Sequence, residues 1–220
     1  MLKAVIFDLD GTIADTERLH DQSFRIVLEK HGVKPAENNG GVIQISGMNA
    51  AANFDLFQKQ YNFSADSNQL VKEKTEVYNK LLEQGNIAAM PGLYELLDNL
   101  KSGGIKMAIA SSSTLHQIEI VIKALKILNY FDAFASGKEV KNGKPAPDVF
   151  LLAAEKLSVA PSDCVVIEDA SSGVVAAKAA GMKVVTVPNE FTIHEDFGAA
   201  DLVVKSLDEL SSEKLKSVLQ

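Results

Sequence analysis

Short apolar runs that alternate with helix-like stretches constrain the fold of this chain more than any other feature. The clearest runs are residues 4–7, 107–110, 165–167 and 184–187, with weaker ones at 133–135 and 202–204. Runs that are apolar at every position are typical of strands buried on both faces of a parallel sheet. Their alternation with helices is typical of repeated strand–helix–strand units. The sequence therefore predicts an α/β protein with a Rossmann-like, doubly wound parallel sheet.

Helical periodicity fills most of the intervals between these runs. Helices are expected at residues 93–100, 115–125, 149–157, 174–180 and 207–219. Pro147 suits the first position of one of these helices, and Gly181 suits the C-terminal cap of another.

Residues 15–86 break the alternation, because this segment is helical and polar and contains no convincing buried strand. Helices are expected at 17–31, 50–61 and 68–82, and the composition of residues 35–41 predicts a loop. We therefore expect a small helical domain at 15–86, inserted into a core that is formed by residues 1–14 and 87–220.

Charge and composition exclude several classes of function. The 220 residues carry a net charge of −7, whereas a surface for nucleic acid or anionic membranes needs clustered basic residues. No apolar run approaches the ~20 residues that span a membrane. Cys164 is the one cysteine, so no internal disulfide is possible, and its apolar neighbours predict a buried thiol. We expect a cytoplasmic monomer that binds neither nucleic acid nor membranes.

Carboxylates follow two of the predicted strands. Asp8 and Asp10 come after the first strand, and Glu168 and Asp169 come after the run at 165–167. In an open parallel sheet, ligands bind outside the carboxyl ends of the strands. An isolated Asp-x-Asp-Gly is equally compatible with a turn, but carboxylates gathered from two strands repel each other unless a cation lies among them. Oxygen ligands suit Mg²⁺.

A third strand end and a loop offer candidates for binding an anion. Ser111, Ser112 and Ser113 follow the run at 107–110. One interpretation is that these serines do no more than begin the next helix. The other is that their hydroxyl and N–H groups bind phosphate at the N-terminus of that helix. Lys144 taken alone is most often a solvated lysine; held beside prolines before a helix, it is also suited to place a positive charge near that anion.

These residues together resemble a known family. Asp8-Leu9-Asp10-Gly11-Thr12, Ser111, Lys144-Pro145 and Glu168-Asp169 are similar to the four ordered motifs of the haloacid dehalogenase superfamily of phosphohydrolases. The helical insert resembles the cap domain of the subfamily that contains β-phosphoglucomutase and small sugar-phosphate phosphatases. The resemblance implies a catalytic core, a cap domain and a Mg²⁺-dependent enzyme that acts on a small phosphorylated metabolite.

The resemblance also implies roles for the carboxylates. Asp8 would be the nucleophile that forms an aspartyl-phosphate, and Asp10 would be the general acid and then the general base. Mg²⁺ would be bound by Asp8, the main-chain carbonyl of Asp10 and Asp169, with Glu168 contributing through water or from behind the ligands. Ser111, the N–H of Ser112 and Lys144 would bind the phosphoryl oxygens.

Substrate-binding residues are expected in the insert. By the same resemblance, Thr16 lies at the hinge, and His20 and Lys74 match a His/Lys pair near the substrate. Considered alone, His20 is more typical of a partly exposed helix residue and Lys74 of a solvated face.

The loop that contains Gly47, Met48 and Asn49 resembles the specificity loop of β-phosphoglucomutase, but it lacks an arginine. The mutase pattern uses that arginine to bind the phosphate that is not transferred, and this chain has Ala50, or Asn49, in its place. A phosphatase is therefore favoured over a β-phosphoglucomutase-type phosphomutase. A non-catalytic protein that binds a phosphate ligand on the same scaffold is the alternative from another class.

Overall fold

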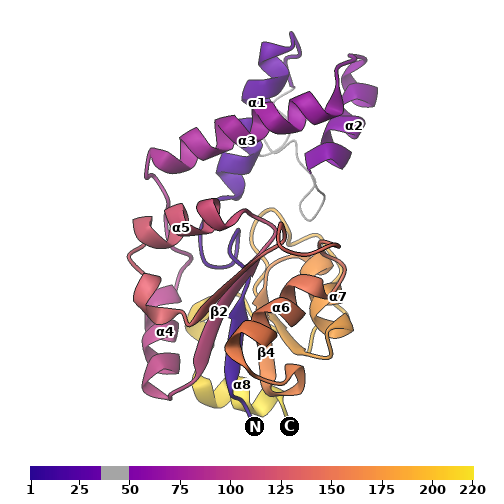
Figure 1. Ribbon diagram of the computed structural model, residues 1–220. Helices are drawn as coiled ribbons and strands as arrows, with labels where there is room; N and C mark the ends of the chain where they lie inside the picture. Colours follow the sequence, from indigo (N-terminus) through magenta and orange to yellow (C-terminus); the bar gives the residue numbers. More distant parts are fainter. Residues whose placement is uncertain (36–49) are drawn as a thin grey trace. The chain divides into compact units, whose positions relative to one another are not determined.

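The computed structural model describes residues 1–35 and 50–220 (Figure 1). The chain divides into two compact units. The core unit comprises Met1–Asp15 and Ile87–Gln220, and the helical unit comprises Thr16–Asn86. Among the described residues, no helix has the length and apolar character needed to cross a membrane.

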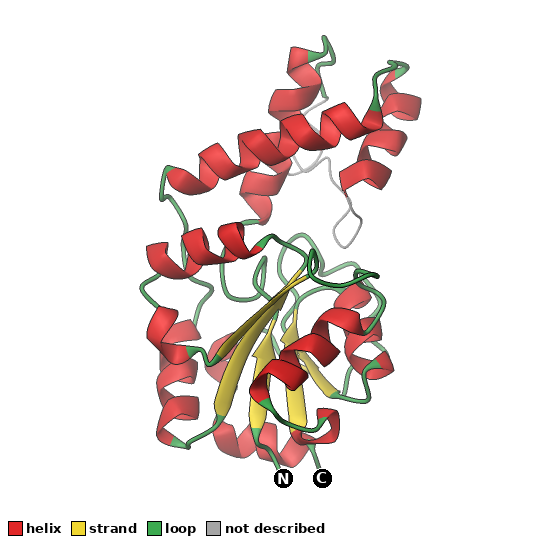
Figure 2. Cartoon of the chain, viewed as in Figure 1, coloured by secondary structure: helices red, strands yellow, loops and turns green. Residues whose placement is uncertain are grey.

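The core unit, all of which the structure describes, alternates strands with helices, except between its last two strands, which no helix separates (Figure 2). Its strands are β1 (Ala4–Phe7), β2 (Lys106–Ser111), β3 (Ala133–Ser136), β4 (Cys164–Glu168), β5 (Lys183–Thr186) and β6 (Leu202–Val203). Its α-helices are α4 (Leu93–Ser102), α5 (Leu115–Ala124), α6 (Asp148–Leu157), α7 (Ser171–Ala179) and α8 (Ser212–Val218). Short 3₁₀ helices cover η1 (Leu128–Tyr130), η2 (Pro161–Asp163) and η3 (Leu207–Glu209).

All six strands form one parallel sheet in the order β3-β2-β1-β4-β5-β6. The chain builds outward from β1 in one direction and then returns to its other side with β4, so the strand order reverses between β1 and β4. Ligands of doubly wound sheets bind at such a switch point, outside the carboxyl ends of the strands. In this chain, β1 is followed by Asp8 and β4 ends in Glu168.

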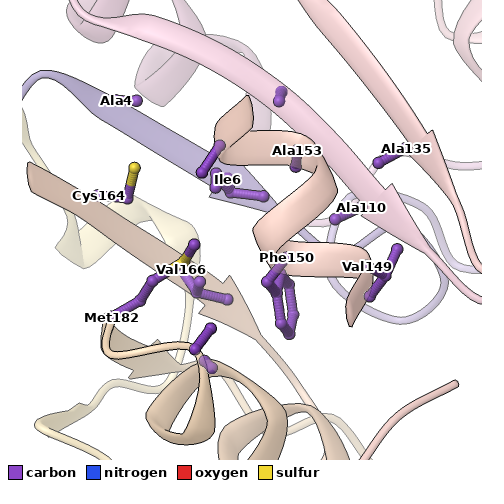
Figure 3. Close-up of a cluster of buried hydrophobic side chains, with 14 of the residues drawn as sticks. Ala4, Ile6, Ala110, Ala135, Val149, Phe150, Ala153, Cys164, Val166 and Met182 are labelled. Carbon is purple, nitrogen blue, oxygen red and sulfur yellow. The ribbon is translucent and has the colours of Figure 1, made fainter. Parts of the chain in front are cut away.

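Small side chains on one face of the sheet bring helices close to the strands (Figure 3). Ala4, Ala110 and Ala135 lie in one buried cluster with Phe150 of α6. Helix α6 packs against β1, β2 and β3, and α7 packs against β4 and β5. Because α6 immediately follows the loop that carries Lys144, this packing also determines where that loop lies at the carboxyl edge of the sheet.

Three helices form the described part of the helical unit. They are α1 (Glu17–Lys30), α2 (Ala50–Tyr61) and α3 (Ser67–Glu83). Phe24, Phe54 and Phe57 contact one another edge-on, with ring centroids 5.1 to 6.2 Å apart. These rings belong to a separate buried cluster, so the unit has an apolar core of its own.

All six predicted strands are present, as is the α/β fold class. The single helix expected at 207–219 is wrong. The structure has a 3₁₀ turn at Leu207–Glu209 and then α8, because Ser206 and Ser211 accept hydrogen bonds from nearby backbone N–H groups and start two separate elements. Helix α7 begins at Ser171, earlier than the predicted residue 174, and Pro147 is the N-cap of α6, so it precedes the first helical position.

Cys164 is fully buried at the start of β4, and burial raises the pKa of its thiol to about 11, with the nearby charge of Asp163 adding to the effect. At about pH 8, roughly one thiol in a thousand would then be the reactive thiolate. We therefore expect an aromatic disulfide reagent to modify the folded protein far more slowly than the urea-unfolded chain. Release of the thiolate product, followed by absorbance, measures both rates; equal rates would contradict the burial of Cys164.

Candidate active site

Asp8 continues the alignment of β1 with β4 for one more residue. Its N–H donates to the carbonyl of Ile167 at 2.9 Å, which places the side chain directly beside the end of β4. The chain then turns sharply: the N–H groups of Ile13 and Ala14 both donate to the carbonyl of Leu9. The turn passes through Gly11, which has φ of 81°, a conformation that glycine adopts without steric cost.

Lys144 joins the two strand ends through its ammonium group. Its Nζ donates to Asp8 Oδ1 at 2.5 Å, to Glu168 Oε1 at 2.7 Å and to the carbonyl of Ala110 at 3.3 Å. The same atom lies 4.7 Å from the centre of the Phe150 ring. The Lys144 side chain is 7% exposed, so it is not the solvated lysine that its loop position alone suggests.

Glu168 is held on both carboxylate oxygens. While Oε1 accepts from Lys144, Oε2 accepts from the backbone N–H groups of Asp169 and Ala170 at 2.8 and 2.9 Å. Gly173 in α7 leaves the space for this side chain, because a Cβ atom there would lie 1.7 Å from Glu168 Oε1. Glu168 is therefore oriented by its surroundings before any ligand binds.

Asp8, Glu168 and Asp169 form a buried group that fits a metal ion. One carboxylate oxygen from each lies within 4.8 Å of the others, and all three residues are buried. One lysine faces these three carboxylates, so the group is left with excess negative charge. Oxygen donors with that excess charge suit a hard divalent cation such as Mg²⁺.

The electrostatics of Asp8 reflect this crowding. Burial raises the pKa of the Asp8 carboxyl well above its ordinary value; Lys144 opposes the shift, while the charges of Glu168 and Asp10 add to it. Burial alone would lower the pKa of Lys144, but its attraction to Asp8 and Glu168 outweighs that and raises it. Lys144 therefore carries its positive charge at neutral pH. The negative charge of the carboxylates that Lys144 does not compensate is the energetically unfavourable part of the site.

Asp10 faces a different set of partners from Asp8. Its Oδ2 accepts from the hydroxyls of Ser111 at 3.3 Å and Ser113 at 2.9 Å. The serines are not needed to begin α5, because Thr114 and Gln117 form the capping box of that helix. The two carboxylates of the Asp-x-Asp pair are thus placed for different tasks.

Ser111 is fully buried, and its hydroxyl also accepts from the N–H of Ser113 at 3.0 Å. Ser112 is exposed beside them. Sequence reasoning considered Ser113 only as part of the serine run and did not place it beside Asp10, although its hydroxyl lies closer to Asp10 than that of Ser111 does. Its spacing of two from Ser111 was the available signal, since alternate residues of an extended segment point the same way.

The structure brings His20 and Lys74 together within the helical unit. Lys74 Nζ lies 2.5 Å from His20 Nδ1, and the His20 ring stacks on Tyr78 with centroids 3.9 Å apart. Lys74 is 7% exposed and Thr16, the N-cap of α1, is fully buried. Gly47, Met48 and Asn49 lie outside the described residues.

The sequence pattern of the haloacid dehalogenase-like hydrolase family matches residues 5–187, which include every motif residue at the edge of the sheet. The chain belongs to this family. The match identifies the protein as an enzyme of a hydrolase family and agrees with its fold.

Three relatives within the family illustrate its range. A phosphorylated carbohydrates phosphatase of Thermotoga maritima is 35% identical over 83% of each chain. The β-phosphoglucomutase of Bacillus subtilis is 33% identical over 97% of this chain and 94% of its own. Crystal structures of CbbY from Rhodobacter sphaeroides have a TM-score of 0.83 at 30 to 31% identity, covering 96% of both chains; one contains phosphate and another xylulose-(1,5)bisphosphate.

The raised pKa of Asp8 predicts a pH dependence of stability in metal-free protein. The folded chain binds the Asp8 proton more tightly than the unfolded chain does, so the contribution of Asp8 to the free energy of unfolding falls as pH rises above about 4. Asp8→Asn has no such proton, and its stability relative to wild type should therefore rise between about pH 5 and about pH 8. Urea unfolding in the presence of EDTA measures this difference.

Asp201→Asn is the control for this experiment. Two lysines and a backbone N–H lower the pKa of Asp201 although its burial opposes them, so Asp201 is ionised in both states and its effect should be constant over the same range. A difference for Asp8→Asn that stays constant or falls with pH would contradict the raised pKa.

Proposed function

We propose that this enzyme is a magnesium-dependent phosphatase that hydrolyses a small phosphorylated metabolite, most simply a sugar phosphate, through an aspartyl-phosphate on Asp8. The observation that carries the proposal is the separation of the two aspartates. Asp8 accepts a hydrogen bond from Lys144 and belongs to the group of carboxylates that could hold a metal ion. Asp10 instead accepts a hydrogen bond from a serine hydroxyl. A nucleophile and a general acid need these two different environments.

Asp8 attacks phosphorus, forming an Asp8 Oδ–P bond as the bond from phosphorus to the leaving oxygen breaks. Asp10 gives its proton to that oxygen, and the alcohol leaves. Asp10 then takes a proton from water, which attacks the phosphorus of the acyl phosphate and releases inorganic phosphate and Asp8. The proton that Asp10 gives is therefore recovered in the second step.

Asp8, Asp169 and the main-chain carbonyl of Asp10 would hold Mg²⁺, with Glu168 acting through water. Bound there, the ion would offset the repulsion between the anionic nucleophile and the phosphate. The hydrogen bonds that the Glu168 oxygens accept from Lys144 and from two backbone N–H groups are compatible with this indirect role.

Lys144, Ser111 and the N–H of Ser112 would bind the transferred phosphoryl group. Lys144 contacts Asp8 directly, so its charge lies beside the atom that becomes bonded to phosphorus. Fixed donors of this kind stabilise charge in the transition state without reorganising.

The helical unit, residues 16–86 in the structure and 15–86 by sequence, would act as the cap that selects the substrate and excludes water. Thr16 would lie at its hinge, and His20, Lys74, Gly47, Met48 and Asn49 would face the substrate. The partly buried contact between His20 and Lys74 supports a role for this pair. The expectation of a cytoplasmic monomer stays a prediction.

The β-phosphoglucomutase relative supports a second candidate, a phosphomutase. A mutase must bind a bisphosphate in two orientations, and Ala50 or Asn49 cannot supply the bidentate grip of an arginine. A non-catalytic phosphate-binding protein is less consistent with the site, because Asp8, Asp10, Lys144 and Asp169 are all retained.

Asp8→Asn should abolish hydrolysis of p-nitrophenyl phosphate, with a loss of roughly 10³-fold or more, because an amide is a poor nucleophile. Asp10→Asn should lose about 10²–10⁴-fold, the usual contribution of a general base, because p-nitrophenolate leaves without a proton but the attacking water still needs Asp10. Product absorbance with Mg²⁺ and with EDTA gives the rates, and Asp201→Asn serves as the control that keeps wild-type activity. Wild-type turnover in Asp8→Asn, or undiminished turnover in EDTA, would refute the proposed mechanism.

The two candidate activities differ in their products. With β-glucose 1-phosphate and a trace of β-glucose 1,6-bisphosphate, a phosphatase releases inorganic phosphate and a mutase forms glucose 6-phosphate. We expect phosphate release to exceed isomerisation, because the arginine that grips the second phosphate is absent. Coupled assays for the two products, run on the same sample, measure the ratio. Fast isomerisation without phosphate release would favour the mutase.

A further inference from the structure

Asn189, in the loop after β5, contacts the side chain of Asp169 from outside the four family motifs. Its amide Nδ2 donates to Asp169 Oδ2 at 2.7 Å and to the carbonyl of Gly11 at 3.2 Å. One amide group therefore links the loop after β5 to a carboxylate of the metal-binding group and to the turn that follows β1.

The other oxygen of Asp169 is also held. Asp169 Oδ1 accepts from the hydroxyl of Thr12 at 3.2 Å, so each carboxylate oxygen has a named donor on a different loop. Asp169 is 3% exposed. At Gly11 a Cβ atom would lie 2.4 Å from Asp169 Oδ2 and 2.6 Å from Asn189 Nδ2, so the turn packs directly on this contact.

Asn189 is itself fixed by its own loop. Its Oδ1 accepts from the N–H of Phe191 at 2.8 Å and from the hydroxyl of Thr192 at 3.4 Å, while its N–H donates to Thr192 Oγ1 at 3.1 Å. With Oδ1 engaged in the loop, Nδ2 must point toward Asp169. The amide orientation is therefore determined by the hydrogen bonds on both sides.

We propose that Asn189 is a positioning residue that orients Asp169 for binding Mg²⁺. The inference rests on the proposed function, which makes Asp169 a ligand of that ion. Mg²⁺ requires near-ideal octahedral geometry, so a ligand that is held in its binding orientation loses less freedom when the ion binds. Hydrogen-bond partners behind metal ligands typically account for a 10–100-fold effect on metal affinity.

A purely structural role for Asn189 predicts something different. If the residue only shaped the loop after β5, its loss would lower the stability of the protein and leave metal affinity unchanged. The two roles can be separated, because Oδ1 serves the loop and Nδ2 serves Asp169.

Asn189→Ser is the primary variant, since a serine hydroxyl can accept from the N–H of Phe191 in the same turn but is too short to reach Asp169. Asn189→Ala is the second variant. Asn189 borders a cavity of about 420 Å³, so the shorter side chains leave space continuous with an existing cavity. Phe191→Ala is the matched control, because it disturbs the same loop but keeps the backbone N–H of Phe191 and the hydroxyl of Thr192 that orient the Asn189 amide.

Isothermal titration of metal-free protein with Mg²⁺ gives the dissociation constant of each variant, and thermal unfolding in EDTA gives its stability. We expect the dissociation constant to rise about 10–100-fold in both Asn189 variants and to stay at the wild-type value in Phe191→Ala. In phosphatase assays, the Mg²⁺ concentration for half-maximal rate should rise by the same factor, and saturating Mg²⁺ should restore most of kcat.

Wild-type Mg²⁺ affinity in folded Asn189→Ser and Asn189→Ala would overturn this inference while leaving the proposed function intact. Equal weakening in Phe191→Ala would also overturn it, because the weaker binding would then follow from any disturbance of the loop. A wild-type protein that neither binds Mg²⁺ nor requires it would remove the proposed function, and the inference with it.

Discussion

Mutual repulsion among buried carboxylates is the constraint on which the rest of the site depends. Asp8, Glu168 and Asp169 approach within 4.8 Å at the switch point of the sheet, and Lys144 compensates only part of their charge. Removing charges from water costs several kcal/mol for each ion unless they are paired. This cost arises because β1 and β4 are adjacent strands. Their pairing brings the carboxylates at the two strand ends to the same point.

The surroundings of the carboxylates convert this unfavourable arrangement into a defined geometry. Glu168 is held by backbone N–H groups, and Asp169 by Thr12 and Asn189. Two close approaches make this possible, since neither Gly11 nor Gly173 could carry a side chain without striking a carboxylate. The orientation of the acidic group is thus part of the folded structure, and the remaining negative charge is what a divalent cation would neutralise.

Most of the fold was predictable from local patterns. The apolar run at 4–7 is β1 to the residue, because polar Lys3 and Asp8 flank it. The same reasoning was wrong at 207–219, where buried Leu207, Leu210 and Leu215 keep a helix-like spacing across two separate elements. Serine caps divided that segment, and spacing alone did not reveal them.

The candidate site was predictable only where its residues lie at strand ends. Asp8, Glu168 and Asp169 could be placed together because parallel strands share one edge. The contact of Asn189 with Asp169 depends on a loop that returns from β5, and no periodicity in the sequence encodes it. The position of Ser113 was predictable in part. Its spacing from Ser111 predicts that the two side chains point the same way, but only the structure shows that both hydroxyls face Asp10.

A crystal structure of the protein with Mg²⁺ and trifluoroberyllate, a mimic of an acyl phosphate, would show which aspartate accepts the phosphoryl group and where the metal ion binds. We expect beryllium bonded to Asp8, an ion shared by Asp8 and Asp169, and Lys144 Nζ within hydrogen-bond distance of a fluorine. An ion bound elsewhere, or beryllium bonded to Asp10 in place of Asp8, would contradict the proposed mechanism.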